Sequence, residues 1–440
     1  MEKTSTNSYA FLSHDELIQK HNAVLPSWIS LFYEEPIAIV SGQDRNVVDA
    51  QGNQYLDFFA GILTNMVGYN IPEINEACLA QAKNVVHTST LYLIPQMIEL
   101  AEQLAKRSGI ENAKVFFTSS GSEANDAALL LASAYRKSSQ LFAMRNSYHG
   151  RTFSTMPITG NRNWSPSALS PFSVSYVHGS YKFRSPMRDA TDEQYVEFAK
   201  NDVADLLAIA TSGDVAAIIA EPIQGVGGFA TPPDGMFAGI KSETDKNGML
   251  WISDEVQTAW GRTGENFWGY QAHGITPDII TFAKGLGNGY AIGGVIARGD
   301  VMDCLQGNSI STFGGNPLSS TAALATLKYI DQHNLQENAL VRGKYIRQRL
   351  DDMKSNNSYM AEVRGKGLMQ GVELVEADGE TPSTSLAAKI MEETKSRGLL
   401  IGKGGLHGNC LRIAPPLSVT ESECEKAMDI LEIACSEAKK

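Results

Sequence analysis

Short apolar runs alternate with longer amphipathic segments along the central part of the chain. In the segment Glu123–Tyr135, the residues Ala124, Ala127, Ala128 and Leu131 recur at helical spacing and would lie on one face of a helix. The apolar runs between such segments are typical of buried strands. These predicted strands are Val115–Thr118, Leu141–Met144, Val215–Ala220, Met249–Ser253 and Ile279–Ala283. The alternation of strands and helices predicts an α/β sheet covered on both faces.

The other segments predict a long loop and a second, more helical module. The segment Gly160–Met187 is rich in Ser, Pro, Asn and aromatic residues, and we expect it to form a long loop excursion. After Ser320 the pattern becomes more helical, and the Glu/Lys/Arg-rich run at 338–354 predicts a solvated helix. We expect roughly the last hundred residues to form a smaller module beside the sheet.

Composition and charge exclude several classes of protein. The chain has 440 residues, of which 43% are hydrophobic and 20% are charged, a balance typical of globular proteins. No apolar stretch approaches the roughly 20 residues that a membrane helix needs. The formal net charge of −12 argues against nucleic acid or an anionic membrane as the main partner.

Cysteine usage and the first residues bear on the cellular compartment. The five cysteines are scattered without a CxxC pair, which is typical of reduced, buried thiols. The N-terminal sequence has no apolar stretch of the kind found in secretory signals. Its first arginine is Arg45, and Asp15 and Glu16 come early, whereas a mitochondrial transit peptide is rich in arginine and poor in acids. We therefore expect a cytoplasmic protein.

The first motif with candidate chemistry is the turn Ser119-Ser120-Gly121-Ser122, which joins a predicted strand to a predicted helix. Backbone N–H groups at such a turn, together with the helix N-terminus, form a seat for an anion, and we expect a phosphate there. A Walker A loop is excluded because no Gly-Lys-Ser/Thr follows. The alternative interpretation is an ordinary helix cap with Glu123 in the first turn.

Two further predicted strands end in chemically active groups. Asp254 and Glu255 follow one strand, and a carboxylate at such a place must be exposed, paired or functional. Lys284 ends another strand and is followed by the glycine-rich segment 285–289. A poorly solvated lysine has a lowered pKa and can act as a nucleophilic amine that forms a Schiff base. The alternatives are a carboxylate at a helix start and a lysine that extends to solvent at the sheet edge.

Taken together, a phosphate seat, a carboxylate and a glycine-flanked lysine are the parts that pyridoxal 5′-phosphate needs. The carboxylate would keep the pyridine nitrogen protonated, so that the ring acts as an electron sink. Open α/β sheets place ligands at the carboxyl ends of their strands, which is where all these residues are predicted.

From Leu31 to Leu431 the sequence resembles the class III (ω-type) pyridoxal-phosphate aminotransferases of fold type I, and within them most closely the alanine–glyoxylate aminotransferase 2 branch. The matching stretches are SSGSEAN (119–125), NSYHGRT (146–152), EPIQG (221–225), DEVQTAWGRTG (254–264), FAKGLGNG (282–289), STFGGNP (311–317), VRGKGLMQG (363–371) and LRIAPPL (411–417). The resemblance implies a large domain over 60–330, with a mostly parallel seven-stranded sheet, and a small α+β domain formed by 1–59 and 331–440.

The resemblance also implies roles for individual residues. Lys284 would hold the cofactor and move a proton, and Asp254 would pair with the pyridine nitrogen. The other cofactor-binding residues would be Ser120, Gly121 and Ser122 at the phosphate, Tyr148 on the ring face with His149 behind it, Gln257 at the phenolic oxygen, Glu221 in support, and Thr312 at a phosphate of the other subunit. Because Thr312 would reach the active site of the other subunit, the resemblance implies a homodimer with shared active sites. It leaves open whether two dimers form a tetramer.

The resemblance places the substrate carboxylate at Arg412, whose planar guanidinium suits a bidentate carboxylate. Related branches that use ω-amine donors have a glutamate shortly after EPIQG that neutralises this arginine, whereas this chain has Val226. We therefore expect a donor such as alanine, or a β- or ω-amino acid, and a 2-oxo acid acceptor such as glyoxylate, pyruvate or 2-oxoglutarate. Ile62 and Tyr92 are candidate pocket walls, with core packing as the alternative.

The sequence also bears on four other functions: a dinucleotide-binding oxidoreductase, a metal hydrolase, a 4-aminobutyrate-type transaminase and an amino-acid racemase or epimerase. The stretch 225–230 fits the dinucleotide pattern G-x-G-x-x-A, but Thr-Pro-Pro-Asp-Gly follows where a helix should begin. The histidines show no metal-binding spacing such as HExxH. A 4-aminobutyrate-type transaminase and an amino-acid racemase or epimerase remain alternatives, because scaffold motifs do not separate reactions that share this cofactor.

Overall fold

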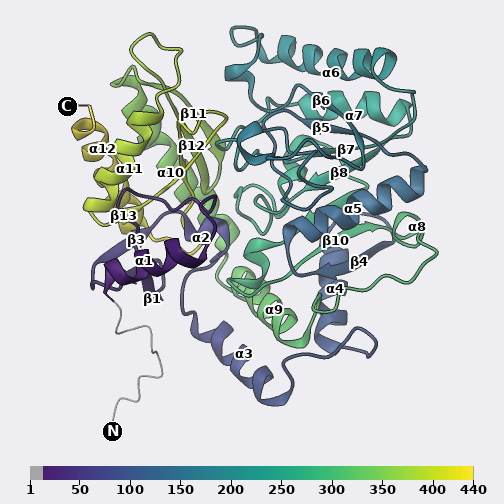
Figure 1. Ribbon diagram of the computed structural model, residues 1–440, viewed down its shortest axis with the longest axis horizontal. Coiled ribbons are helices and arrows are strands. Elements are labelled where there is room, and N and C mark those ends of the chain that lie inside the picture. The colour runs from purple at the N-terminus through teal and green to yellow at the C-terminus, as the bar shows by residue number, and fades with distance from the viewer. Residues whose placement is uncertain (1–12, 440) are drawn as a thin grey trace.

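The computed structural model describes residues 13–439. Residues 1–12, the first part of the segment on which the expectation about targeting rests and of the predicted small domain, lie outside this range. None of the helices in the range combines the length and the apolar character that a bilayer span requires. Figure 1 shows one body built on a large sheet and a second that contains both ends of the described chain.

The large sheet has seven strands in the order β4-β10-β9-β8-β7-β5-β6. Only β10 runs antiparallel to its neighbours, so the predicted mostly parallel seven-stranded sheet is confirmed. The strands are β4 (Ala113–Thr118), β5 (Gln140–Met144), β6 (Ser173–Val177), β7 (Val215–Ala220), β8 (Leu250–Asp254), β9 (Ile279–Phe282) and β10 (Gly293–Arg298). Right-handed crossovers through helices are the usual way to connect parallel strands, which accounts for the alternation seen in the sequence.

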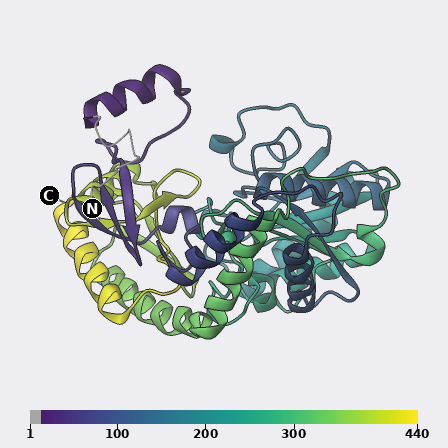
Figure 2. The same ribbon diagram turned by 90° about the horizontal axis from the view of Figure 1, so that it is seen from below.

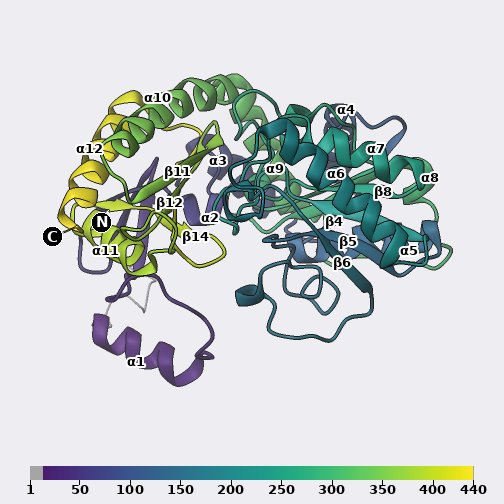
Figure 3. The ribbon, with the colours of Figure 1, turned by 90° about the horizontal axis from the view of Figure 1, so that it is seen from above.

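Helices cover both faces of this sheet (Figures 1 and 3). Neighbouring residues of the same strand point to opposite faces. Phe142 of β5 and Ile218 of β7 belong to the apolar cluster on one face. The adjacent residues Leu141 and Ile219 belong to the cluster under α5 on the other face. Both faces are dry, so the strands are apolar without polar alternation. The helices of this body are α3 (Pro72–Asn84), α4 (Pro95–Arg107), α5 (Gly121–Arg136), α6 (Asp192–Ile209), α7 (Met236–Lys246), α8 (Gly299–Met302) and α9 (Pro317–Gln332).

The second body contains two four-stranded sheets, β1-β2-β3-β13 and β11-β12-β15-β14. Their strands are β1 (Ile39–Gln43), β2 (Asn46–Asp49), β3 (Gln54–Asp57), β11 (Met360–Lys366), β12 (Met369–Leu374), β13 (Leu399–Leu400), β14 (Gly402–Gly404) and β15 (Cys410–Ile413). The strand β13 pairs in parallel with β3, so the two ends of the chain share a sheet. The helices here are α1 (His14–Val24), α2 (Ala60–Leu63), α10 (Leu335–Ser355), α11 (Thr384–Ser396) and α12 (Glu421–Glu437). Helix α1 has no buried residue and lies apart from the rest of the chain (Figures 2 and 3).

Two expectations from the sequence need correction. The segment Gly160–Met187 is not only a loop, because it contains the edge strand β6. That strand has serine at alternate positions and is only partly buried, so it lacks the apolar run that marks the other strands. The helix at 338–354 is not solvated all round: Ala339, Ile346 and Leu350 of α10 are buried. Their spacing of seven and four residues is that of one helix face packed against the second body.

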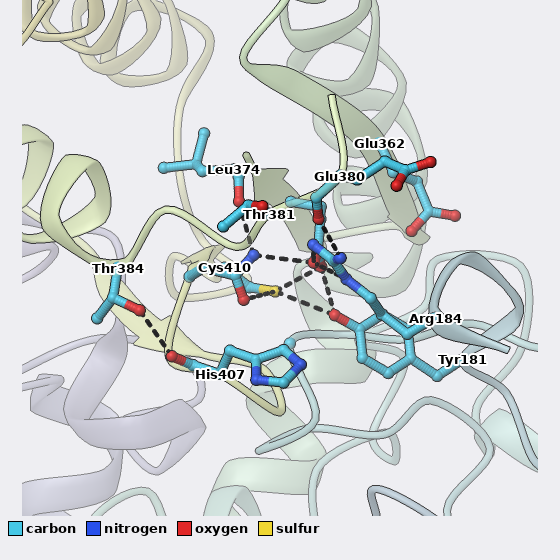
Figure 4. Close-up of polar contacts among 12 residues, drawn as sticks. Tyr181, Arg184, Glu362, Leu374, Glu380, Thr381, Thr384, His407 and Cys410 are labelled. Atoms are coloured by element: carbon cyan, nitrogen blue, oxygen red, sulfur yellow. Dashed lines mark hydrogen bonds and ion pairs between the residues drawn. The ribbon is translucent and has the colours of Figure 1, made fainter. Parts of the chain in front are cut away.

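A buried ion-pair cluster joins the two bodies (Figure 4). Glu373 of β12 is fully buried and accepts hydrogen bonds from Arg364 Nη2 (3.0 Å) and Arg184 Nε (2.9 Å). Tyr181 OH, at 2.5 Å, and Cys410 Sγ, at 2.9 Å, donate to the same carboxylate. Arg184 and Tyr181 precede α6 in the first body, whereas the other members belong to strands of the second. The cluster thus fixes the sheet that carries Arg412 against the sheet that carries Lys284.

Glu373→Gln should lower the free energy of unfolding by about 3 kcal/mol, because the buried Arg364 and the partly buried Arg184 lose the carboxylate that they share, and only Glu362 remains to pair with Arg364. Burial opposes ionisation of Glu373, but Arg364 and the donated hydrogen bonds outweigh it and hold the pKa of this carboxyl at about 2. The contribution is therefore complete above the ordinary value of 4.5 and disappears as the pH falls from there towards 2. Urea unfolding at pH 7 and at pH 3 measures both effects. Glu380→Gln, an exposed carboxylate 3.9 Å from Arg188, is the control and should change stability by less than about 0.5 kcal/mol.

Candidate active site

A cavity of about 350 Å³ lies at the carboxyl ends of the parallel strands. Its lining residues include Ser119, Ser120, Gly121, Ser122, Asn125, Tyr148, His149, Glu221, Asp254, Gln257, Lys284 and Tyr290. The structure therefore brings together the residues that the sequence analysis placed at the phosphate, the ring and the Schiff base. Three other predicted site residues, Thr312, Ile62 and Tyr92, do not line it, and Arg412 lies behind Gln257.

The turn between β4 and α5 presents the start of a long helix to the cavity. Ser120 is the N-cap, and its side-chain oxygen accepts from the Glu123 backbone N–H at 3.2 Å. Glu123 in turn accepts from the Ser119 N–H at 2.9 Å. The N–H groups of the first helical turn at Gly121 and Ser122 have no partner within the helix, which makes this end of α5 electropositive. A Cβ at Gly121 would approach Val256 to 3.1 Å, so glycine keeps the turn close to the strand β8.

Asp254, at the end of β8, is buried and held from two sides. Its Oδ2 accepts from Asn125 Nδ2 and from His149 Nδ1, both at 2.8 Å. Thr281 of the neighbouring strand β9 donates to Asn125 Oδ1 at 2.7 Å, which fixes the amide with its N–H₂ towards Asp254. These donors fix the orientation of the carboxylate, which lines the cavity. The buried Nε2 of His149 has no hydrogen-bond partner in the described chain.

Sequence reasoning assigned no role to Asn125, although it lies in the quoted motif SSGSEAN. It is 1% exposed and occurs on the apolar face of α5, one residue after Ala124 and three before Ala128. Burial of a carboxamide on such a face costs free energy unless it is hydrogen-bonded. An asparagine on an otherwise apolar helix face is therefore the sequence feature that could have indicated a role for Asn125. The structure shows that it connects α5 with β8 and β9.

Glu221, at the end of β7, supports the wall that carries Tyr148. Its carboxylate accepts from the Tyr148 backbone N–H at 2.9 Å and from the Gly225 N–H at 2.8 Å. Burial raises the pKa of Glu221, while His149 opposes and Asp254 adds to this shift. The Tyr148 ring is held edge-on by Trp164, with 5.6 Å between the ring centroids.

Lys284 follows β9 with a left-handed backbone (φ 45°) and extends into the cavity. Burial lowers its pKa to about 8, and the charge of Arg412 adds to the effect, whereas Asp254 and Glu221 oppose it. Within residues 13–439, no hydrogen bond or ion pair engages its Nζ. A Cβ at the next residue, Gly285, would lie 2.1 Å from the Met66 methyl group, so glycine is needed there. The arrangement provides an accessible and partly deprotonated amine.

Arg412 of β15 is 3% exposed and approaches the cavity from the second body. Its Nη2 donates to Gln257 Oε1 at 2.9 Å, and its Nε has no partner in the described chain. Burial lowers the pKa of Arg412 to about 10, so the guanidinium stays charged at neutral pH. A buried cation with unsatisfied N–H groups next to a cavity is suited to bind an anion.

The remaining predicted site residues lie on the surface of this single chain. Thr312 lines a separate hollow beside Ser119 and Phe313. Ile62 is 45% exposed, and Tyr92 is 71% exposed. Their expected roles at a shared site or as pocket walls stay predictions.

The cavity fits the pyridoxal phosphate that the sequence predicts. The end of α5 offers unpaired N–H groups, Lys284 offers an amine without a partner, and Asp254 is oriented by two donors. The unpaired His149 Nε2 marks a place for a further polar atom in the cavity wall. These groups come from different strands, yet they converge on one space.

Comparisons with known proteins agree with this site. A family model described as aminotransferase class-III matches residues 33–435. An alanine–glyoxylate aminotransferase 2 homolog of Arabidopsis thaliana, named as mitochondrial, is 37% identical over 430 residues, which cover 97% of this chain and 89% of the relative. An alanine/serine racemase of Pyrococcus horikoshii is 35% identical, with coverage of 95% and 90%. The structure of a thermostable (S)-enantioselective ω-transaminase from Thermomicrobium roseum matches with a TM-score of 0.90 at 31% identity, covering 98% of this chain and all of that one.

Proposed function

The chain belongs to the class III aminotransferases and is a pyridoxal-phosphate-dependent aminotransferase, and from this membership we propose that it transfers the amino group of alanine, or of a β- or ω-amino acid, to glyoxylate, pyruvate or 2-oxoglutarate. One observation carries the choice of substrates. The buried Arg412 forms no ion pair among the described residues, and by the resemblance Val226 occupies the sequence position at which related branches have a glutamate. Both half-reactions can therefore use this cation to hold a carboxylate.

The bound cofactor supplies an electron sink that lowers the energy of a carbanion at the substrate α-carbon. Lys284 Nζ would hold the cofactor, and the same amine, when free, would carry a proton between the substrate carbon that bears the amino group and the cofactor. Asp254, whose carboxylate is oriented by Asn125 and His149, would pair with the pyridine nitrogen. Gly121 and Ser122 bind the phosphate through the start of α5, and Tyr148 covers the ring.

Absorbance spectroscopy of the purified holoenzyme tests the proposal. L-alanine should bleach the visible band of the lysine-bound cofactor, and glyoxylate should restore it. A band that L-alanine leaves untouched but 4-aminobutyrate bleaches would contradict alanine as the donor and leave an ω-amino acid in its place. Racemisation of L-alanine without any 2-oxo acid would contradict the substrate assignment and favour a racemase, since a transaminase needs an acceptor to turn over.

Arg412→Ala should raise the KM for L-alanine at least about 100-fold, because a charge-assisted bidentate contact contributes roughly 3 kcal/mol. The KM for an amine without a carboxylate, such as 1-phenylethylamine, should change less than about threefold. Steady-state kinetics with both donors measures this selectivity. Equal effects on the two donors would refute the carboxylate contact.

We further propose a homodimer in which Thr312 reaches the partner's phosphate site. Apolar side chains that are exposed in the single chain support a contact with a second copy: Leu91, Tyr92, Leu93, Ile310 and Phe313. Thr312 lies between the last two. Sedimentation velocity tests the proposal, and a fully active monomer would refute it.

We also propose that the chain is divided into a large domain over 60–330 and a small domain formed by 1–59 and 331–440. We further propose that the protein is located in the cytoplasm. The large sheet takes all its strands from 113–298, while both small sheets use chain outside 60–330. The cysteines are all free, which agrees with a reducing compartment. Limited proteolysis near residues 60 and 330, and cell fractionation, test the two statements.

A further inference from the structure

The guanidinium of Arg412 is held between two aromatic rings. Its Cζ lies 4.9 Å from the ring centroid of Phe59 and 4.6 Å from that of Phe229. Both rings are buried, at 7% and 0% exposure. Such contacts are favourable because the face of an aromatic ring is electronegative, and they strengthen when the cation is removed from water. With Gln257 at one edge, the guanidinium is bounded on three sides.

Two glycines of the backbone leave room for this arrangement. A Cβ at Gly404 would lie 2.7 Å from Arg412 Cδ, so glycine allows the arginine stem to pass. A Cβ at Gly402 would lie 2.2 Å from the Phe59 ring, so glycine also allows that ring its position. Phe32 stacks on the outer face of Phe59 at 5.8 Å and 23°. The ring of Phe59 is therefore fixed from both sides.

Phe229 has a backbone conformation that is unfavourable for a residue with a bulky side chain. Its φ is 56°, in the left-handed region that bulky residues rarely adopt. It follows Gly227 and Gly228, so a more tolerant residue stands immediately before it. Strained backbone of this kind persists where the surrounding structure enforces it and is concentrated at functional sites.

The enforcing contacts come from the buried cluster around Glu373. Arg364, which pairs with Glu373, also donates through Nε to the Gly228 carbonyl oxygen at 3.0 Å, and this holds the turn that presents Phe229. Cys410, labelled in Figure 4, contacts the same carboxylate and lies on β15 two residues before Arg412. One cluster thus positions both the ring and the arginine.

We propose that Phe59 and Phe229 are specificity-determining residues that hold the Arg412 guanidinium in a single orientation and so restrict turnover to substrates with a carboxylate. The inference rests on the proposed role of Arg412. An amine without a carboxylate leaves the unsatisfied N–H groups of a buried cation without a partner. A mobile arginine could turn towards solvent, where water would satisfy its N–H groups. An arginine held between two rings cannot, so its N–H groups stay unsatisfied when the bound amine has no carboxylate.

The test compares holoenzymes carrying Phe229→Leu and Phe59→Leu with the wild type. Leucine keeps the site apolar but removes the ring face. The ratio of kcat/KM for L-alanine to that for 1-phenylethylamine should fall at least tenfold in each variant. The dissociation constant for propionate, a carboxylate without an amine, should rise at least fivefold in a spectrophotometric titration. Phe229→Tyr, which keeps the ring, should retain the wild-type ratio.

Phe237→Leu is the matched control, because Phe237 is equally buried but packs on Trp251 and His273 under α7. A fall in the ratio in this variant as large as in the others would overturn the proposal. Unchanged propionate binding would also overturn the proposal. It would do so if it is seen in every one of the two variants, Phe59→Leu and Phe229→Leu, that folds. If the wild type fails to use alanine, the donor assignment fails, while weaker propionate binding in the leucine variants still supports the role of the two rings.

Discussion

Lys284→Ala should lower kcat by at least about 10⁴-fold, because the variant loses both the amine that holds the cofactor and the base that moves the substrate proton. The cavity itself should remain. Asp254, Gly121 and Ser122 are held by contacts that do not involve Lys284, so equilibrium dialysis should still show cofactor binding, without the visible band of the lysine-bound form. Stopped-flow and steady-state assays with L-alanine and glyoxylate measure the loss.

Two observations would contradict this assignment. One is wild-type turnover in the variant. The other is an equal loss in Lys241→Ala, the control, in which a partly buried lysine paired with Asp245 on α7 is removed. The pH dependence gives an independent check. With a pKa of about 8, the amine is mostly protonated at pH 6 and mostly free at pH 9. Association of the cofactor with the unloaded wild-type protein should therefore accelerate as the pH rises through about 8 and level off above it.

Asp254→Asn should lower kcat about 10³-fold while changing the volume of the side chain very little, since it removes the carboxylate that we propose pairs with the pyridine nitrogen. The hydrogen bonds of Oδ2 need not be lost, because an asparagine oxygen in the same place can still accept from both Asn125 and His149. A purely structural role would instead predict nearly unchanged activity in the folded variant. Single-turnover kinetics with alanine isolates the proton-transfer step.

The control for Asp254→Asn is Asp126→Asn. This carboxylate lies on α5 next to Asn125, is half-buried with a pKa raised by burial, and does not line the cavity. The same chemical change there should alter kcat by less than about threefold. A loss in this control comparable to that in Asp254→Asn would assign the effect to packing under α5.

Most of the cofactor site could be predicted from sequence because its residues lie where strands end. Asp254 and Lys284 each follow an apolar run, and parallel strands bring their carboxyl ends to one edge of a sheet. The strand β6 was missed because an edge strand is half-solvated and carries serines in place of an apolar run. The strand β10 was missed as well, although it lies inside the sheet, because it begins with two glycines and follows the glycine-rich segment 285–289. The edge strand β4, in contrast, was predicted from its apolar run, so the local pattern reports apolar runs and not the position of a strand in the sheet.

The surroundings of Arg412 were beyond sequence reasoning for a different reason. Phe59, Phe229 and Arg412 are separated by more than a hundred residues at each step and meet only through the pairing of β15 with β12 and the turn after β7. No local periodicity reports such a contact. The resemblance supplied Arg412, whereas the rings beside it and the amide of Asn125 behind Asp254 became visible only with the fold.

Lys284 is a residue that folding alone disfavours. It is half-buried, its amine has no partner among the described residues, and its backbone has a left-handed φ of 45° that costs about 1 kcal/mol for a residue with a side chain. Cofactor binding repays this cost, since a ligand that binds only the native state adds to its stability. The unloaded chain is accordingly the form that opens more often and meets cellular proteases more often. Cofactor supply would then govern the lifetime of the protein, and so its abundance, as well as its activity.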